Sequence, residues 1–364
     1  MGRLGRGEFS TSFIFSRNGR QRIQFTSRGC NKQHLLNGSK PRNGIRHNTS
    51  AADKKKALRH DEVISPYSNI KDDRELFVAL QDKDIFAKLQ EDLAKQHEDM
   101  IKTSLEELRK DSDQILYLPK KAQQVVDAYL HIRVGGAVAA SPYHINPGLR
   151  GTNRAALGKG TPAEIEALAA KYFKQYDMHV QGTEQLRTFL VCCGIGIDCS
   201  GFASWVLNEV TQASLGRPIW KCLRFPGIRR SVISKARPVQ NISANLLTGL
   251  INSDPITDLG EVRPGDLLRV AGWHHVVVIT EVGTDKAGRA YYFQYAQSSC
   301  MYGSESGVRT GYAIIKLPKE PLLAQQWHDS SETGVLKELI AEGGADSRAV
   351  RLKALSGSDP NIAG

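Results

Sequence analysis

The clearest hydrophobic pattern in the chain begins after Asp198. From Cys199 onward, apolar residues recur at helical spacing: Phe202, Trp205, Val206 and Val210. This spacing predicts a helix with one buried face. Asp198 is a favoured N-cap residue, so Cys199 is expected on the first turn of that helix. There the helix dipole and the unpaired backbone N–H groups favour a thiolate. Cys199 is therefore a candidate nucleophile, and the alternative is an inert thiol buried under a helix.

Alternating and β-branched apolar runs follow further along the chain. They predict four strands of an antiparallel meander, near 266–271, 275–282, 290–297 and 308–316. Pro264-Gly265 forms the turn before the first strand, and His275 begins the run Val276–Ile279. A nucleophilic cysteine needs a base such as histidine to take its proton. We expect the helix that starts at Cys199 to pack against this sheet, in an α+β fold.

Helical spacing also predicts helices over 72–112, 121–132 and 242–252, and two more between 161 and 194. The first of these two should begin with Thr161 as cap, Pro162 in the first turn and Glu164 completing a capping box. The second is expected to be capped by Thr183 and to stop at Gly194.

One stretch resembles a phosphate-binding loop, Gly158-Lys159-Gly160-Thr161. The phosphate-loop pattern requires Ser or Thr directly after the Lys, where this chain has Gly160, so we assign the stretch to the helix start.

The positive charge is concentrated at the N-terminal end. Of 49 Lys and Arg residues, 14 lie in residues 1–60, against two acidic residues, Glu8 and Asp53. That segment carries +12, and the remainder, with 35 basic and 36 acidic residues, carries −1. Without a core-building pattern, the segment is expected to be a disordered basic tail. Its composition is compatible with a transit peptide, a contact with a polyanion such as nucleic acid, anionic lipid or wall polymer, a misplaced start codon, or a plain solvated arm.

These patterns suggest four parts of the chain. We expect a tail over 1–60, a helical region over 61–118, a catalytic domain over 119–320 with a helical insert at 150–194, and a C-terminal extension over 321–364. Phe13–Phe15 is too short for the apolar core of a secretory signal, and no apolar run is long enough to span a membrane. The spacing of the six cysteines matches no zinc pattern, so neither a metal nor another cofactor is expected.

Three motifs together resemble the NlpC-type cysteine peptidases, bacterial enzymes that cut the peptide stems of the cell wall. They are Asp198-Cys199-Ser200-Gly201-Phe202, Pro264-Gly265-Asp266-Leu267-Leu268 and His275-Val276-Val277-Val278-Ile279. The resemblance covers roughly residues 130–317. It implies a papain-like fold, with the catalytic cysteine at the start of a helix packed on an antiparallel sheet. The family also suggests a location in the cell envelope or outside the cell.

The resemblance implies the site residues. Cys199 would attack, and His275, directly before the apolar strand, would act as base, whereas His274 would face the opposite side. In the family a His, Asn or Gln on the next strand orients the base. Gln297 takes that place here, although Tyr295 shares its face by strand alternation.

Three further residues are expected to bind substrate. Ser141-Pro142-Tyr143 is similar to a family segment whose Tyr lies near the cysteine, so Tyr143 is one of them, with Asp198 and Ser200 beside the nucleophile. Basic residues of the 213–240 loop either border the cleft or form a solvated loop: Arg224, Arg229, Arg230, Lys235 and Arg237.

The implied reaction is hydrolysis of an amide through a thioester, with the γ-D-glutamyl to diamino acid bond of a wall peptide as the usual target in the family. Two alternatives stay open. The same Cys and His could serve an acyltransferase or an amidase on another substrate, because the insert before Cys199 reshapes the groove. The chain could also be a non-catalytic protein that binds wall polymer or polyanions through its tail. The oligomeric state is not predicted.

Overall fold

A computed structural model describes residues 13–15, 21–23, 103–146, 153–180, 182–227, 237, 239–270, 275–329, 335, 339 and 347–357. The chain divides into two units, residues 1–86 and residues 87–364. In the first unit the described parts are two short antiparallel strands, β1 (Phe13–Phe15) and β2 (Gln21–Ile23). The rest of the predicted basic tail, and the predicted helix up to residue 102, lie outside the described residues.

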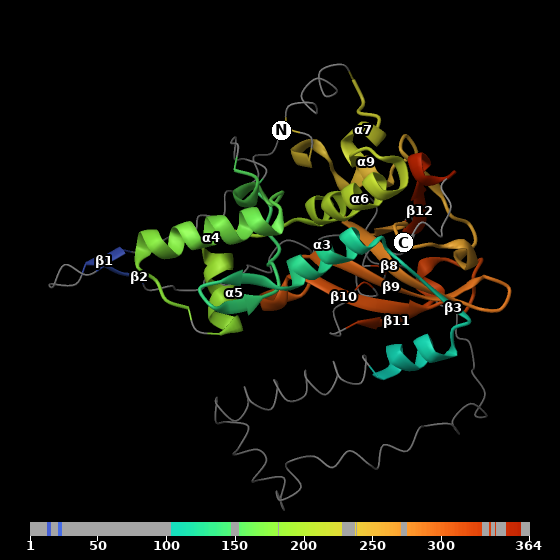
Figure 1. Cartoon of the computed structure of the whole chain (residues 1–364), viewed down its shortest axis with the longest axis horizontal. Helices are drawn as coiled ribbons and strands as arrows, with labels where there is room; N and C mark the ends of the chain where they lie inside the picture. Colours follow the sequence, from blue (N-terminus) through green and yellow to red (C-terminus); the bar gives the residue numbers. More distant parts are fainter. Residues whose placement is uncertain are drawn as a thin grey trace, which may run out of the picture. The chain divides into compact units, whose positions relative to one another are not determined.

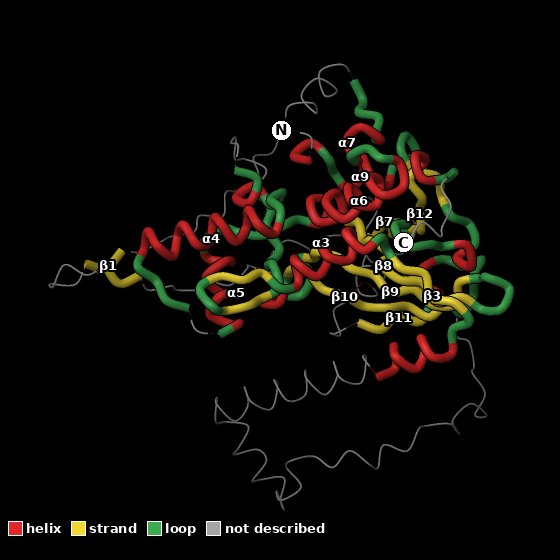
Figure 2. Tube along the Cα trace, viewed as in Figure 1, coloured by secondary structure: helices red, strands yellow, loops and turns green. Residues whose placement is uncertain are grey.

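An eight-stranded sheet with antiparallel pairing organises the second unit, and its fold is α+β (Figures 1 and 2). Its strands are β3 (Gln114–Tyr117), β6 (Ser253–Pro255), β7 (Leu267–Val270), β8 (His275–Thr284), β9 (Ala290–Ser299), β10 (Gly307–Ile314), β11 (Gln326–Asp329) and β12 (Arg348–Leu352). The order is β11-β10-β9-β8-β7-β12-β6, and β3 also pairs with β8.

The predicted meander is confirmed as β7 to β10. Its first turn depends on Gly265, which adopts φ +92°, a conformation that L side chains rarely take. The turn is closed by hydrogen bonds to β8, from Gly265 N to Ile279 O and from Ile279 N to Asp266 O. The sheet is larger than predicted, because β3 comes from the expected helical region and β11 and β12 from the expected C-terminal extension. The expected boundaries at 118/119 and 320/321 therefore separate strands of one sheet.

The described helices match the apolar spacing with shifted ends. Residues 103–111 are helical. They are followed by α3 (Lys120–Leu130), α4 (Pro162–Tyr176), α5 (Thr183–Cys192), α6 (Cys199–Leu215), α7 (Ile219–Cys222) and α9 (Ala244–Thr248). A short hairpin, β4 (Ile132–Val134) and β5 (Ala137–Ala139), lies between α3 and α4.

Local capping explains which ends were predictable. The capping box at Thr161 and Glu164 is present as predicted, with Pro162 in the first turn. The cap predicted for α5 was wrong by one residue, because Gly182 is the cap and Thr183 is already the first helical residue. The predicted stop is confirmed, because Cys193 is the C-cap and Gly194 follows it with φ +61°. The helix expected over 242–252 is confined to Ala244–Thr248, which Ser243 caps.

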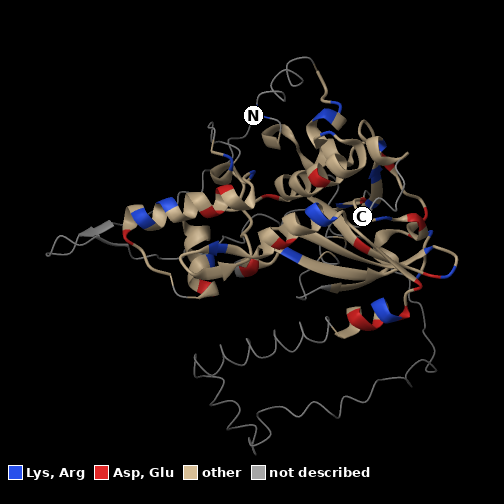
Figure 3. Cartoon of the chain, in the orientation of Figure 1, with Lys and Arg blue, Asp and Glu red and all other residues tan. Residues whose placement is uncertain are grey.

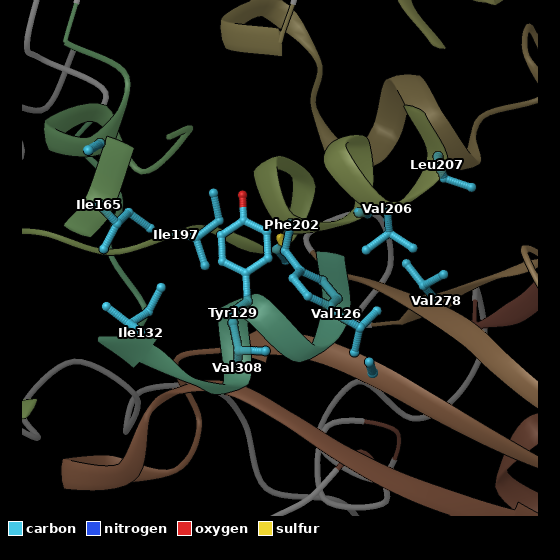
Figure 4. Close-up of a cluster of buried hydrophobic side chains, with 14 of the residues drawn as sticks. Val126, Tyr129, Ile132, Ile165, Ile197, Phe202, Val206, Leu207, Val278 and Val308 are labelled. Carbon is cyan, nitrogen blue, oxygen red and sulfur yellow. The ribbon is translucent and has the colours of Figure 1, made fainter. Parts of the chain in front are cut away.

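Apolar residues cover both faces of the sheet. On one face, α3 and α6 pack against the sheet, and Tyr129 meets Phe202 edge to face at 5.5 Å, beside Val206 and Val278 (Figure 4). On the other face, Phe293 and other apolar side chains of β7, β8 and β9 pack with Trp327 of β11. The helices α4 and α5 lie beside the β4-β5 hairpin, next to one end of the sheet (Figure 1). The α6 helix thus contacts α3 and the strands β8 and β9.

Charged side chains of both signs occur on the described helices and strands (Figure 3), as expected from the nearly neutral remainder of the sequence. Within the described part of the chain, none of the helices has the length and apolar character needed to cross a membrane.

A buried ion pair joins β12 to the turn before β7. Arg351 donates two hydrogen bonds to Asp266, from Nε to Oδ1 at 2.8 Å and from Nη2 to Oδ2 at 2.7 Å. The Asp266 side chain is 4% exposed. Because this turn leads into the strands of the predicted site, the pair connects the C-terminal strand to that region.

Replacing Arg351 should therefore destabilise the protein strongly. In Arg351→Met the carboxylate of Asp266 stays buried without its cation, and we expect a loss of about 3 kcal/mol in the free energy of unfolding. The matched control is Lys353→Met, which removes an exposed pair with Asp254 at 3.6 Å and should change stability by about 0.5 kcal/mol or less. Urea unfolding followed by circular dichroism measures both, and equal effects would contradict the interpretation.

Candidate active site

The predicted nucleophile lies where the sequence places it. Cys199 is the first residue of α6, and the Asp198 side chain caps the helix by accepting from Gly201 N at 2.6 Å. Cys199 is buried and belongs to the core cluster under α6. The first N–H groups of a helix have no partner within the helix and carry its partial positive charge. The cap uses the Gly201 N–H, and the start of α6 places the partial positive charge of the helix beside the thiol.

Gly201 allows another segment to approach the start of α6. A Cβ atom at Gly201 would lie 2.7 Å from the carbonyl oxygen of Gly158, closer than real contacts permit. That carbonyl accepts from Asp198 N at 2.9 Å, and Lys159 forms an isolated antiparallel bridge with Ile197. The Gly158–Gly160 stretch is therefore bound to the residues immediately before the nucleophile.

Lys159 lies under the first turn of α6. Its ammonium group donates to Asp198 Oδ1 at 2.9 Å, Ser200 Oγ at 2.6 Å and Ile242 O at 3.0 Å. Ser200 Oγ in turn donates to Asp198 Oδ1 at 3.1 Å. The side chains of Asp198 and Ser200, which we expected to bind substrate, are thus used within the protein, to cap α6 and to hold Lys159. Sequence analysis did not select Lys159 as a site residue.

The segment with Tyr143 runs beside the approach to Cys199. Tyr143 forms a parallel bridge with Ile197, two residues before the nucleophile, and Tyr143 N donates to Ser306 O at 3.0 Å. Arg187 of α5 donates to the same carbonyl at 2.7 Å. Tyr143 is half-buried. The backbone of this residue is therefore near the cysteine, as the motif predicts, and the helical insert reaches the same place through Arg187.

The predicted base and its orienting residue are in direct contact. His275 is the first residue of β8, and its Nε2 lies 2.6 Å from Gln297 Oε1 on β9. Both side chains are buried. Gln297 Nε2 donates to the hydroxyl of Tyr302 at 2.7 Å, so its amide oxygen is directed at the imidazole. Sequence analysis missed Tyr302, which lies in the loop after β9, outside the three motifs.

This chain of contacts selects one form of the imidazole. An amide oxygen only accepts, so Nε2 of His275 carries a proton, and Nδ1 is the nitrogen through which the ring can take or give a proton. A neutral histidine in this form can take a proton through Nδ1 while Gln297 fixes the plane of its ring. The arrangement is that of a base held by an amide.

The structure also distinguishes Gln297 from Tyr295, which the strand pattern places on the same face. Tyr295 pairs with Ile279 and packs against Trp327, with ring centroids 5.6 Å apart. The Gln297 side chain, two residues further along β9, is the one that contacts His275. His274 lies outside the described residues, and so do Arg229, Arg230 and Lys235 of the basic loop.

The loop with Tyr302 is itself held in place. The Arg309 guanidinium lies 3.5 Å from the centroid of the Tyr302 ring, and Arg309 Nη2 donates to Glu305 at 3.1 Å. Arg309 belongs to β10, the strand that follows this loop. Tyr302, whose hydroxyl orients Gln297, is therefore held through its ring as well as through its hydrogen bond.

A half-buried histidine, His144, lies just before the helical insert. His144 Nε2 lies 3.1 Å from the carbonyl oxygen of Ala156, and burial lowers the pKa of His144 below its usual value. His144 N donates to Ile197 O. A neutral His144 therefore fits a packing role between the insert and the residues before Cys199.

Among the residues that the structure describes, no group of three or more His, Cys, Asp or Glu side chains is placed to hold a metal ion. Comparisons with protein-family models, with curated proteins and with solved structures found no match to this chain.

The other thiols should be slow to react. Burial raises the pKa of Cys193 to about 11, and it also raises the pKa of Cys192 and of Cys222. A raised pKa means that the protonated thiol dominates at pH 8, where the thiolate of Cys193 is about one part in 10³. We expect iodoacetamide to modify these three residues slowly at pH 8 and faster as pH rises toward 11. Peptide mapping after timed labelling measures this, and rates independent of pH would contradict it.

Proposed function

We propose that the chain is a cysteine hydrolase with a papain-like arrangement, which cleaves an amide bond through a thioester. The single observation that carries the proposal is the contact between His275 and Gln297, with Tyr302 behind it. A buried histidine whose ring is oriented by an amide is what a thiol nucleophile needs as its partner. Cys199 at the start of α6 supplies that thiol.

The proposed mechanism assigns one role to each group. Cys199 transfers its proton to Nδ1 of His275 and attacks the carbonyl carbon of the amide. The backbone N–H of Cys199, at the start of α6, helps to bind the oxyanion of the tetrahedral intermediate. His275 then gives the proton to the leaving amine, and Cys199 keeps the acyl group as a thioester. Water, deprotonated by His275, hydrolyses the thioester and restores the thiol.

The substrate class rests on the motifs and on the position of Tyr143. The Asp198–Phe202 and Pro264–Leu268 motifs resemble those of NlpC-type peptidases. The bridge between Tyr143 and Ile197, two residues before Cys199, supports a role for Tyr143 in binding substrate. We therefore propose a wall stem peptide as substrate, with cleavage between γ-D-glutamate and the diamino acid. Tyr143 would contact this peptide, and Arg187 beside it makes the insert a border of the binding region.

Purified stem peptides, incubated with the protein and analysed by liquid chromatography and mass spectrometry, test the proposal. We expect release of the diamino acid fragment, with kcat/KM reduced by about 10⁴-fold in Cys199→Ala and in His275→Ala. Gln297→Ala should lower it less, by about 10²-fold, because the amide orients the base and carries no proton.

The matched control for Gln297→Ala is Gln294→Ala, a half-buried amide on the same strand, which should leave turnover unchanged. Thermal melting of each variant separates lost chemistry from lost folding. Activity that survives Cys199→Ala in the folded protein would refute the proposal.

A further inference from the structure

Lys159 is a buried cation with every donor position occupied. Its side chain is 9% exposed, and its ammonium group makes three hydrogen bonds, to Asp198, Ser200 and the carbonyl of Ile242. An ammonium group has three donors, so the cluster satisfies it completely. Burying a charge in this way is costly, and such groups are commonly paired. Here the partner is the carboxylate that caps the nucleophile helix.

Two of the residues that bind Lys159 flank the nucleophile in the sequence. Asp198 and Ser200 are the two neighbours of Cys199, and Lys159 Nζ is within hydrogen-bond distance of both side chains. The backbone holds Lys159 in place, through its bridge to Ile197 and through the bond from Trp205 Nε1 to Lys159 O at 3.0 Å. The ammonium group is therefore fixed within about one helical turn of the Cys199 backbone.

The charge on Asp198 poses a problem for a thiolate. A carboxylate is a good N-cap, but its negative charge next to Cys199 disfavours a second negative charge. The negative charge of the same carboxylate also favours the protonated forms of two other groups, Tyr129 and His144. The nearby Arg154 and Glu164 pair with each other, so Lys159 is the cation bonded to Asp198.

We propose that Lys159 is a positioning residue that neutralises the Asp198 carboxylate and so permits Cys199 to ionise, while Asp198 keeps its capping bond to Gly201. This inference rests on the proposed function, because it concerns the reactivity of the same cysteine. The Gly158–Gly160 stretch positions this lysine. Gly201 leaves room for the bond from Asp198 N to Gly158 O, and this bond places Lys159 at the first turn of α6.

A purely structural role makes a different prediction. If Lys159 only held α6 in place, loss of its bonds would slow alkylation even when the charge of Asp198 is removed as well. If Lys159 neutralises charge, its removal should slow alkylation when Asp198 is present, and in the Asp198→Asn background it should restore the rate of the unaltered protein, because both charges are then absent. Asn caps helices about as well as Asp, so this background keeps the bond to Gly201 N and removes the charge.

The experiment measures the rate of Cys199 alkylation by iodoacetamide from pH 5 to pH 9, by peptide mapping of the full chain. In Lys159→Met the rate at pH 7 should fall about tenfold and the pH profile should move to higher pH. The double variant with Lys159→Met and Asp198→Asn lacks both charges, and its rate should lie within about twofold of the rate of the unaltered protein. Asp198→Asn alone leaves the ammonium group without its carboxylate and should speed alkylation.

The outcomes separate the two proposals. A double variant that is alkylated as slowly as Lys159→Met alone, or a Lys159→Met variant that is alkylated as fast as the unaltered protein, would overturn the role of Lys159. If Lys159→Met alone fails to fold in thermal melting, the single variant Asp198→Asn decides, because slower or unchanged alkylation there contradicts charge neutralisation. If Cys199 of the unaltered protein reacts no faster than the exposed Cys300, the proposed function itself fails, whatever Lys159 does.

Discussion

The backbone of Ile197 is the point on which the candidate site depends. Its N–H donates to Pro142 O, and its carbonyl accepts from His144 N and from Ser298 Oγ. Lys159 pairs with the same residue in an isolated bridge. Three stretches far apart in the sequence are thus bonded to the residue two places before Cys199. Each bond contributes only about 1 kcal/mol, but together they fix the position of α6 relative to the strand that carries Gln297.

Much of this architecture could be predicted because it is local. The cap at Asp198, the capping box at Thr161 and the meander from β7 to β10 depend on residues close together in sequence, and periodicity indicates them. Strand partners far apart in the sequence could not be found in this way. The strand β12 lies between β7 and β6 through long-range backbone pairing, and the ion pair of Arg351 with the buried Asp266 adds to its contacts.

The same distinction applies to the site. Cys199, His275 and Gln297 belong to or follow recognisable motifs, and the structure brings His275 and Gln297 together. Lys159 and Tyr302 had no such signal, because their importance comes from contacts with residues that sequence analysis had already selected. Lys159 is distant in sequence from its partners. It belongs to the Gly158–Thr161 stretch, which superficially resembles a phosphate-binding loop, and its ammonium group donates to the carboxylate of Asp198.

The most direct test of the thioester mechanism is the mass of the protein during turnover. The protein is mixed with a soluble stem peptide, quenched in acid within the first turnovers and analysed by intact-mass and peptide-mapping mass spectrometry. A thioester mechanism predicts an added mass equal to the acyl part of the substrate, located on Cys199 and removed by hydroxylamine. Release of the amine without any adduct on Cys199, together with equal release by Cys199→Ala, would contradict it.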